Sequence, residues 1–317
     1  MKTIEDLQKF YNEELIKDLE VLETKRKKTL STVFAVLLPL LAVIAVVMLF
    51  FSDKGSNALI FIVVIAIAVI FLIFSLLTRG YVSTFKDTVI HKIVEFIDPN
   101  LSYNKSNYVT SSEFMNSGIF LREPDRYKGE DYVRGILDKT NIEFSEINAE
   151  YETRDNKGRK SYHTIFKGLF FIADFNKDFK GRTLVLPDTA EKLFKGLGKM
   201  LQSWNISRPE LIKLEDPEFE KHFAVYGTDQ IEARYILSTS LMKRICDFRE
   251  KSRKKLALSF VNSRLYIALT TNKNMLEPRL FRTLLNFKLV QEYFEDLKLA
   301  VDIVEDLNLN RRIWSKQ

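Results

Sequence analysis

Two long runs of apolar residues near the N-terminus constrain this chain more than any other feature. Residues 33–51 read VFAVLLPLLAVIAVVMLFF and residues 58–77 read ALIFIVVIAIAVIFLIFSLL, and neither run contains a charged residue. A helix of about twenty residues spans roughly 30 Å, which is the hydrocarbon thickness of a bilayer. A core helix of a soluble protein rarely needs so many apolar residues on every side. The pattern therefore predicts a membrane α-helical hairpin of two transmembrane helices.

The residues that flank these runs predict the orientation of the hairpin. Basic residues occupy positions 25–28, before the first run, and Arg79 follows the second run. The predicted turn at 52–57 offers a single lysine beside an aspartate. Because cytoplasmic flanks carry the excess of basic residues, both termini are expected in the cytosol. The segment before the first run is too long for a cleaved signal peptide and mixes acids with bases, so this run is expected to remain as an anchor.

Helices are also predicted on either side of the hairpin. Residues 3–28 have an amphipathic pattern, and the apolar stripe consists of Ile4, Leu7, Tyr11, Leu15, Leu19 and Leu22. The stripe suits either a docking or coiled-coil segment for a partner, or a helix that packs on its own cytosolic domain or stem. The second interpretation is favoured, because amphipathic helices usually bury their stripe within the same chain. After the second run a helical stem is expected as far as residue 97, before Pro99.

In the remainder of the chain, strand patterns come first and helical patterns are interspersed later. This order predicts a soluble α+β domain with a mainly antiparallel sheet. The predicted regions are 1–28 (amphipathic cytosolic helix), 29–79 (two-span hairpin), 80–99 (helical stem) and 100–317 (cytosolic domain). The expected strands are 132–137, 141–153, 161–175, 183–186, two within 209–228, and a hairpin at 256–271. The expected helices are 112–117, one from Asp188 or Thr189 to about Trp204, 229–250, and one that begins near Pro278.

Two of these strands carry a more detailed expectation. In 141–153 the apolar residues change from one parity to the other, which predicts a β-bulge near Ser145. The strand at 161–175 contains GLFFIADF and is apolar on both sides. A strand of this kind is expected at the centre of the sheet, with helices over both faces.

The residues give no recognisable arrangement for catalysis, cofactor binding or metal binding. Histidine occurs only at His91, His163 and His222, which lie far apart, and the single cysteine, Cys246, excludes an internal disulfide. The segment KGLGKM at 195–200 lacks the first glycine and the final Ser or Thr of a phosphate-binding loop. The formal net charge of +6 is too small and too dispersed for a nucleic-acid binder. We therefore expect no cofactor, no metal and no nucleic-acid partner.

One basic cluster is the candidate binding surface. It consists of Arg249, Lys251, Arg253, Lys254 and Lys255. Such a cluster suits contact with anionic lipid headgroups or with an acidic partner. The alternative is a solvated helix end, where basic residues are favoured by the helix dipole.

Several motifs resemble those of a known family. These are the charged N-terminal helix, the two-span hairpin, GLFFIADFNK followed by FKGRTLVLPD, and LEDPEFEKHFAVYGTDQIEARYILSTSLMKRI. Together they resemble the uncharacterised bacterial family catalogued as domain of unknown function 3137. The resemblance implies a multi-pass protein of the bacterial cytoplasmic membrane with a cytosolic domain, and a membrane-protein partner such as a LemA-type protein. It implies no activity, cofactor or catalytic residue.

The sequence thus favours a membrane-anchored cytosolic interaction or scaffold module that binds a protein partner or the membrane surface. The alternative is a membrane-tethered enzyme whose carboxylates and arginines assemble only in the fold. Its first candidates are Asp174, Asp216, Asp229 and Arg234, within the family-like motifs. A transporter is a weaker third option, since neither apolar run contains an intramembrane charge.

Overall fold

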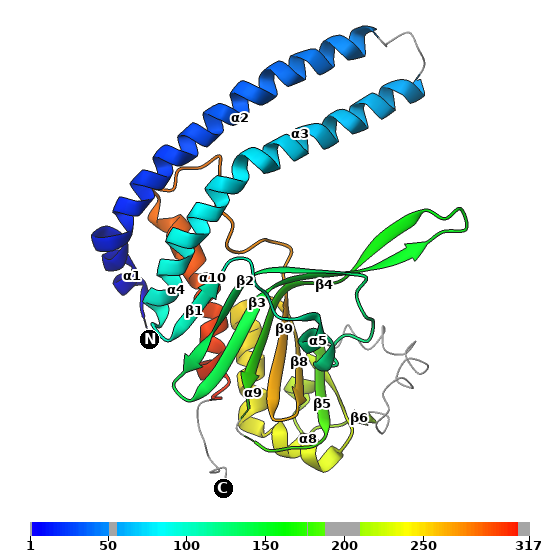
Figure 1. Cartoon of the computed structure of the whole chain (residues 1–317). Coiled ribbons are helices and arrows are strands. Elements are labelled where there is room, and N and C mark those ends of the chain that lie inside the picture. Colours follow the sequence, from blue (N-terminus) through cyan, green and yellow to red (C-terminus); the bar gives the residue numbers. More distant parts are fainter. Residues whose placement is uncertain (1, 51–55, 176, 188–209, 310–317) are drawn as a thin grey trace. The chain divides into compact units, whose positions relative to one another are not determined.

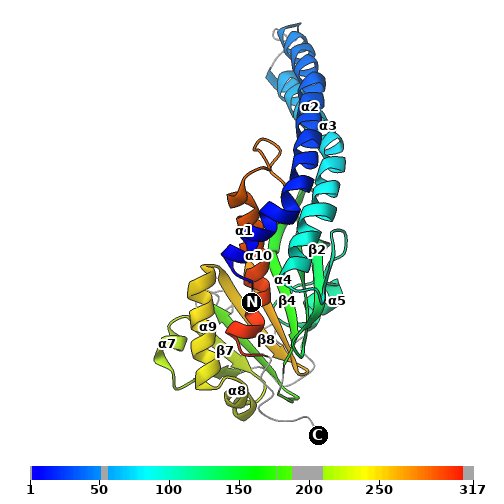
Figure 2. The same cartoon turned by 90° about the vertical axis from the view of Figure 1, so that its left-hand side faces the viewer.

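The structure is a computed structural model that describes residues 2–50, 56–175, 177–187 and 210–309. It divides into two compact units. The first unit comprises Met1–Ile93 and Leu276–Phe294, and the second comprises Val94–Met275 and Glu295–Gln317. The first unit is helical, and the second is built on one sheet (Figures 1 and 2). Most of the predicted turn at 52–57 and the predicted helix from Asp188 or Thr189 to Trp204, with the segment 195–200, lie outside the described residues.

Two helical paths run through residues 4–50 and 56–97. The first consists of α1 (Ile4–Phe10), the π-helical turn η1 (Tyr11–Leu15) and α2 (Ile16–Phe50). The second consists of α3 (Ser56–Phe85), the π-helical turn η3 (Lys86–Ile90) and α4 (His91–Ile97). Thr3 and Asp6 form a capping box, in which each side chain accepts a hydrogen bond from the backbone N–H of the other. The predicted N-terminal helix and the helical stem are therefore confirmed as helices.

In the part of the two apolar runs that the structure describes, the chain is helical and most side chains are exposed or half-buried. Their most apolar windows have mean hydropathies of 2.9 and 3.2, and only 6% and 11% of these windows is buried. Phe61 and Phe71 of α3 are 74% and 73% exposed. Surfaces of this kind are costly in water, because each exposed large apolar side chain forgoes about 1.5–3 kcal/mol of burial. The chain therefore has two long apolar helices, each long enough to cross a bilayer.

The amphipathic stripe of the N-terminal helix packs within the first unit. Leu7, Leu15 and Leu19 are buried, whereas Ile4 is 48% exposed. Ion pairing reinforces the contact with the second helical path, because the Nζ of Lys92 lies 2.5 Å from Oδ2 of Asp18. The interpretation that this helix buries its stripe against its own chain is confirmed.

The second unit contains a nine-stranded sheet in the order β1-β2-β3-β4-β9-β8-β5-β7-β6. The strands are β1 (Leu101–Asn104), β2 (Arg126–Leu137), β3 (Thr140–Arg154), β4 (Lys160–Asp174), β5 (Arg182–Pro187), β6 (Glu210–Ile212), β7 (Phe223–Gly227), β8 (Lys255–Val261) and β9 (Arg264–Thr270). Every strand pair of the described residues is antiparallel. The α+β domain with an antiparallel sheet is thus confirmed.

Helices cover both faces of the central strand β4, as its sequence predicts. On one face, Phe114 of the short helix α5 (Ser111–Asn116) contacts Phe166 and Phe170 at ring-centroid distances of 6.0 and 5.3 Å. On the opposite face lie α9 (Thr239–Ser252) and residues 295–306 of α10 (Phe287–Asp306) (Figure 2). The face under α5, hereafter the α5 face, is the one that carries the candidate site.

The bulge predicted near Ser145 lies opposite that residue, in the neighbouring strand β2. Glu130 and Val133 of β2 pair with Glu146 and Phe144, so the register between β2 and β3 shifts across Ser145. Toward β4, Ser145 pairs regularly with Phe170, and the register shifts at Ala149 and Glu150. The apolar residues change parity because β3 is buried on both faces: Phe144 lies on one face with its partner Phe171, and Ile147 belongs to the core of the α5 face. The change of parity thus reflects burial on both faces of β3, while the extra residue of the bulge belongs to β2.

The boundaries of two predicted helices are wrong. The helix expected at 229–250 is divided into α8 (Gln230–Ile236) and α9, because the Ser238 hydroxyl accepts from the Leu241 N–H and starts a new helix. The last helix begins at Phe287 rather than near Pro278. Residues 276–285 are irregular, and their backbone bonds to side chains of α2 instead of forming a helical turn.

Candidate functional site

Strand register assembles a row of polar side chains on the α5 face. Ser102 of β1 lies opposite Arg134 of β2, Arg134 lies opposite Glu143 of β3, and Glu143 lies opposite Ile172 of β4. Directly opposed residues of an antiparallel pair project to the same side of a sheet. The register also places Asp174 opposite Arg264 of β9. Polar residues from five strands therefore converge on one part of the sheet surface.

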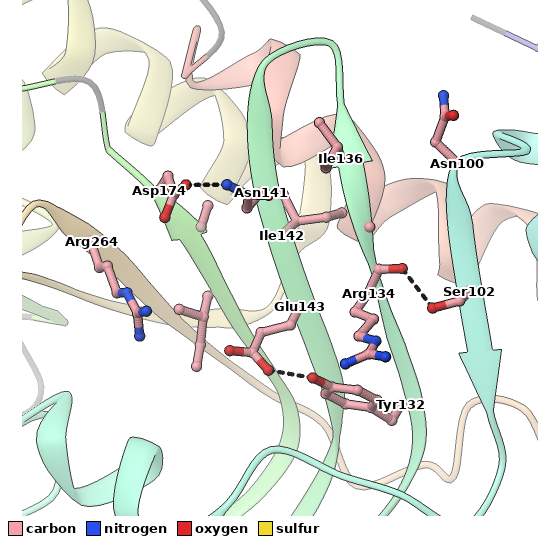
Figure 3. Close-up of a pocket in the computed structure, with 13 residues that line it drawn as sticks. Asn100, Ser102, Tyr132, Arg134, Ile136, Asn141, Ile142, Glu143, Asp174 and Arg264 are labelled. Atoms are coloured by element: carbon pink, nitrogen blue, oxygen red, sulfur yellow. Dashed lines mark hydrogen bonds between the residues drawn. The ribbon is translucent and has the colours of Figure 1, made fainter. Parts of the chain in front are cut away.

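An open pocket lies over this row (Figure 3). It has a volume of about 350 Å³. The residues that line it are Asn100, Ser102, Tyr132, Arg134, Gly135, Ile136, Asn141, Ile142, Glu143, Ile172, Ala173, Asp174 and Arg264. Its size suits a small polar molecule or a few residues of a polypeptide.

The edge strand β1 closes one side of the pocket and depends on a glycine. A Cβ at Gly135 would lie 2.2 Å from the backbone oxygen of Asn100 and 3.0 Å from the Cα of Leu101. A side chain at this position would therefore push the start of β1 away from β2. Gly135 is required for this close approach, which keeps Asn100 and Ser102 beside the pocket.

Hydrogen bonds orient the two carboxylates of the pocket. The Tyr132 hydroxyl donates to Oε2 of Glu143 at 2.6 Å, and Nδ2 of Asn141 donates to Oδ2 of Asp174 at 2.5 Å (Figure 3). Burial and the hydrogen bond to Glu143 raise the pKa of Tyr132 to about 12, so the phenol stays protonated at neutral pH. A carboxylate accepts several hydrogen bonds, so Glu143 and Asp174 keep acceptor capacity for a ligand.

The two guanidinium groups differ in their bonding. Nη1 of Arg264 lies 3.3 Å from Oε1 of Glu113 on α5, whose other oxygen accepts from the Tyr266 hydroxyl. Among the described residues, no carboxylate lies within ion-pair distance of the exposed Arg134, although Glu143 is its cross-strand neighbour. Arg134 thus keeps donors for a carboxylate or phosphate of a ligand, which guanidinium groups bind in bidentate fashion.

The polar groups of the pocket suit the recognition of a polar ligand. Its hydroxyls are Ser102 and Tyr132, and Ser102 donates to the Arg134 carbonyl oxygen at 3.1 Å. The pocket contains no histidine, lysine or cysteine that would activate a hydroxyl as a nucleophile. Within the described ranges, no group of three metal-ligating side chains occurs. Oriented donors and acceptors of both charges remain, and these suit a polar ligand.

The basic cluster predicted as a binding surface lies at the end of α9 and the start of β8. Lys251 pairs with Asp306 at 2.7 Å and with Asp302 at 3.2 Å. Arg253 takes the left-handed conformation that ends α9, with a φ of 52°. Arg253 and Lys255 are exposed, whereas Lys254 lies 3.8 Å from an Asp296 oxygen. Lys251 and Lys254 of this cluster therefore lie near carboxylates of the same domain. The role of the cluster in binding stays a prediction.

The four residues of the enzyme hypothesis do not come together. Asp216 caps the short helix α7 (Pro217–Glu220), and Asp229 caps α8. Arg234 donates to the backbone oxygen of Lys213 at 3.4 Å. Only Asp174 of this set lines the pocket. Capping of the helix N-termini thus accounts for the presence of Asp216 and Asp229 at these positions.

Sequence reasoning missed most of the pocket. Tyr132, Arg134 and Ile136 share one parity of β2, and Asn141 and Glu143 share one parity of β3. Further along β3 the same parity carries Ile147 and Ala149, which are buried under α5. A change from apolar to polar residues along one face of a strand was the available signal, because it marks where the covering layer ends.

Comparison with known proteins confirms the family resemblance. Residues 164–309 match the family described as "Protein of unknown function (DUF3137)". No curated protein matches the chain. The crystal structure of the mycobacterial trehalose monomycolate transport factor A, TtfA, is similar with a TM-score of 0.34 and 8% identity, over 66% of this chain and 95% of that chain. A TM-score this low does not establish a shared architecture, so that protein's role does not bear on this chain.

Proposed function

We propose that this chain, whose residues 164–309 carry a domain of the DUF3137 family, is a membrane-anchored interaction module of the bacterial cytoplasmic membrane. Two transmembrane helices hold the sheet domain at the cytosolic face, and the pocket on the α5 face recognises a partner. The observation that carries the proposal is the pair of long helices with exposed, uncharged runs in a chain whose folded domain has an open charged pocket.

The apolar helices support the membrane part of the proposal. Their side chains remain exposed over lengths sufficient to cross a bilayer, and lipid would cover them. Exposed basic residues flank both runs on one side, namely Lys25, Lys27, Lys28 and Arg79. By the positive-inside bias, this side faces the cytosol together with both termini.

The form of the pocket supports recognition of a polypeptide segment. The pocket is open, it lies next to the edge strand β1, and it presents guanidinium, carboxylate, amide and hydroxyl groups together. A segment of mixed charge would pair its acidic side chain with Arg134 and its basic side chain with Glu143 or Asp174. Electrostatic complementarity of this kind gives specificity more than affinity.

Site-specific photocrosslinking in the native membrane tests the proposal. A photoreactive residue at Ile136, which is 51% exposed and lines the pocket, is expected to give discrete adducts. A matched probe at Ile231 of α8, which is 80% exposed, reports on surface away from the pocket. Charge reversal by Arg134→Glu with Arg264→Glu should abolish the Ile136 adducts. Identical adducts from both probes, or adducts indifferent to the charge reversal, would contradict the proposal.

The basic cluster is a second surface within the same proposal. Arg249, Arg253 and Lys255 would contact an acidic partner or anionic headgroups, and a LemA-type membrane protein is one such partner. A crosslinking pull-down that compares the full chain with Arg253→Glu, Lys254→Glu and Lys255→Glu tests this surface. A reproducible partner that the charge-reversed protein loses would assign the surface, and a partner retained by it would exclude the cluster.

A membrane-tethered enzyme is the second candidate function. One observation favours it: the pocket gathers Glu143, Asp174, Arg134 and Arg264, which are the residue types that this hypothesis requires. The full chain in proteoliposomes would be incubated with a small-molecule extract, in parallel with Glu143→Gln. Consumption of a compound by the unmodified protein alone would favour the enzyme, and identical profiles would favour the interaction module.

A further inference from the structure

The loop at residues 276–285 is bonded to α2, ahead of the first apolar run, by buried charged side chains. Glu23 and Arg26 of α2 form an ion pair of 2.6 Å, and their side chains are 7% and 9% exposed. Nη1 of Arg26 donates to the Leu280 carbonyl oxygen at 2.7 Å, and Oε2 of Glu23 accepts from the Leu284 N–H at 3.0 Å. Residues 276–285 are therefore fixed along α2, although they lie more than 250 positions away in the chain.

This loop buries three leucines, Leu276 among them, and exposes two other apolar side chains. Leu280 and Leu284 are 8% and 1% exposed, whereas Phe281 and Leu285 are 66% and 42% exposed. Loops normally present polar residues to water, so two large apolar side chains exposed on a loop that buried bonds hold in place make it a candidate contact surface.

The ring of Phe281 lies beside the second apolar run. It stacks on Phe74 of α3, with ring centroids 6.4 Å apart and an interplanar angle of 12°. Phe74 belongs to the run at 58–77 and precedes its end by one helical turn. The hydrogen bond to Arg26 places Leu280 beside the basic residues that precede the first run. Both contacts put the loop at the cytosolic end of the apolar helices.

The charges around the loop complement an anionic lipid surface. Arg282 on the loop and Arg79, just after the second run, are exposed, and no carboxylate of the described residues lies within ion-pair distance of either. Lys27 and Lys28, just before the first run, are also exposed. Arg279 differs, because it pairs with Glu292. An apolar ring with flanking guanidinium groups is the composition of an interfacial membrane anchor.

We infer that residues 276–285 form a third membrane contact, which binds the headgroup region of anionic phospholipids at the cytosolic surface. Phe281 enters the boundary between headgroups and acyl chains, and Arg282 with Arg79 binds lipid phosphates. The inference rests on the proposed membrane spanning of α2 and α3. It adds a lipid-binding site on a segment that follows the sheet strand β9 in the chain.

Depth-dependent quenching tests the position of Phe281. The full chain with Trp204→Phe and Trp314→Phe would carry Phe281→Trp and be reconstituted in phosphatidylethanolamine and phosphatidylglycerol vesicles. Lipids brominated near the glycerol backbone should quench this tryptophan more strongly than lipids brominated near the chain ends. Phe61→Trp in the second run, 74% exposed, is the control. If Phe61→Trp is quenched and Phe281→Trp is not, the loop does not contact lipid, and the inference fails while the proposed membrane spanning stands. If neither tryptophan is quenched, both the inference and the proposed membrane spanning fail.

The lipid preference tests the role of the arginine. The association of spin-labelled phosphatidylglycerol relative to phosphatidylcholine would be measured by electron paramagnetic resonance for the full chain and for Arg282→Gln. Loss of one headgroup-bound basic residue should lower the ratio roughly fivefold. Lys288→Gln is the matched control. Lys288 follows Phe287, whose ring centroid lies 5.5 Å from that of Tyr11. Tyr11 lies about 22 Å along the helix from Arg26, so Lys288 is expected far from the headgroups. An equal ratio for Arg282→Gln and Lys288→Gln would overturn the headgroup contact.

Discussion

The buried ion pair of the first unit and the charged pocket of the second unit use the same side-chain types in opposite ways. Glu23 and Arg26 are almost fully buried and bond both to each other and to the backbone of residues 276–285. In the pocket, Arg134 is exposed, and Arg264 and its partner Glu113 are 44% and 30% exposed as side chains. The first pair holds two distant segments of the chain together, whereas the second set keeps capacity to bind a ligand.

The difference teaches how to separate structural charges from recognition charges. A buried charge that loses its partner is left uncompensated, so its removal costs stability. An exposed charge contributes little to stability, because water already solvates it. Substitutions in the two regions should therefore affect different properties of the protein.

Removal of Glu23 should have the largest effect. Glu23→Ala leaves the buried Arg26 without a carboxylate and the Leu284 N–H without its acceptor, which should destabilise the first unit by about 3–5 kcal/mol. Thermal unfolding in detergent would show a lower Tm, and limited proteolysis would show faster cleavage within 276–285. The double variant Glu23→Met with Arg26→Leu should recover much of the loss, since it removes both charges. A single variant as stable as the original would contradict the structural role of the pair.

Gly135→Ala should have the next largest effect, on the second unit. The added Cβ would meet the Asn100 backbone oxygen at 2.2 Å, so β1 must shift, at a cost of about 1–3 kcal/mol. Adducts from a photoreactive Ile136 should decrease at the same time. Gly80→Ala is the control, because nothing lies within 4 Å of its added Cβ and α3 should gain about 0.5–1 kcal/mol. Equal effects of the two substitutions would refute the close approach of β1.

Substitution of the pocket arginines should leave stability almost unchanged. Arg134→Ala with Arg264→Ala should alter the free energy of unfolding by about 0.5 kcal/mol or less, since both side chains are exposed. The measurement is chemical denaturation of the full chain in detergent, together with the Ile136 crosslinking assay. A large loss of stability would show that these arginines support the fold, as Arg26 does.

The smallest effect concerns Tyr132 at alkaline pH. Its pKa is raised from 10.0 to about 12, first by burial and then by Glu143, while Arg134 acts in the opposite direction. Because the folded state favours the neutral phenol, its stabilising contribution is complete below pH 10 and is lost as the pH rises through 12. Ultraviolet titration should find one fewer phenol with a pKa near 12 in Tyr132→Phe. Loss of a phenol that titrates near pH 10 instead would place Tyr132 in a solvated environment.

The sequence predicted the elements whose burial pattern is uniform. The apolar runs and the two-sided strand β4 were predictable because one pattern extends over many residues. The β8–β9 hairpin was predictable because Asn262 and Ser263 tolerate positive φ angles, which are 52° and 56° in the structure. These elements are determined by local chemistry.

The pocket and the loop at residues 276–285 could not be predicted in the same way. Arg134, Glu143 and Asp174 meet through the registers of three strands, and register is not visible in a single strand. Similarly, Glu23 and Leu284 are 261 residues apart. Pro278 resembled a helix start because its neighbours are apolar, but those neighbours contact α2 and α3 instead.

Thiol accessibility tests the central claim, that two membrane-spanning helices hold the sheet domain at the cytosolic face. In a Cys246→Ser background, a cysteine would replace either Asp53 between the apolar runs or Ile136 in the pocket. With intact cells and a membrane-impermeant maleimide, we expect labelling of Asp53→Cys, and labelling of Ile136→Cys only after permeabilisation. Labelling of both from the same side, or release of the protein from membranes by alkaline carbonate, would contradict the account.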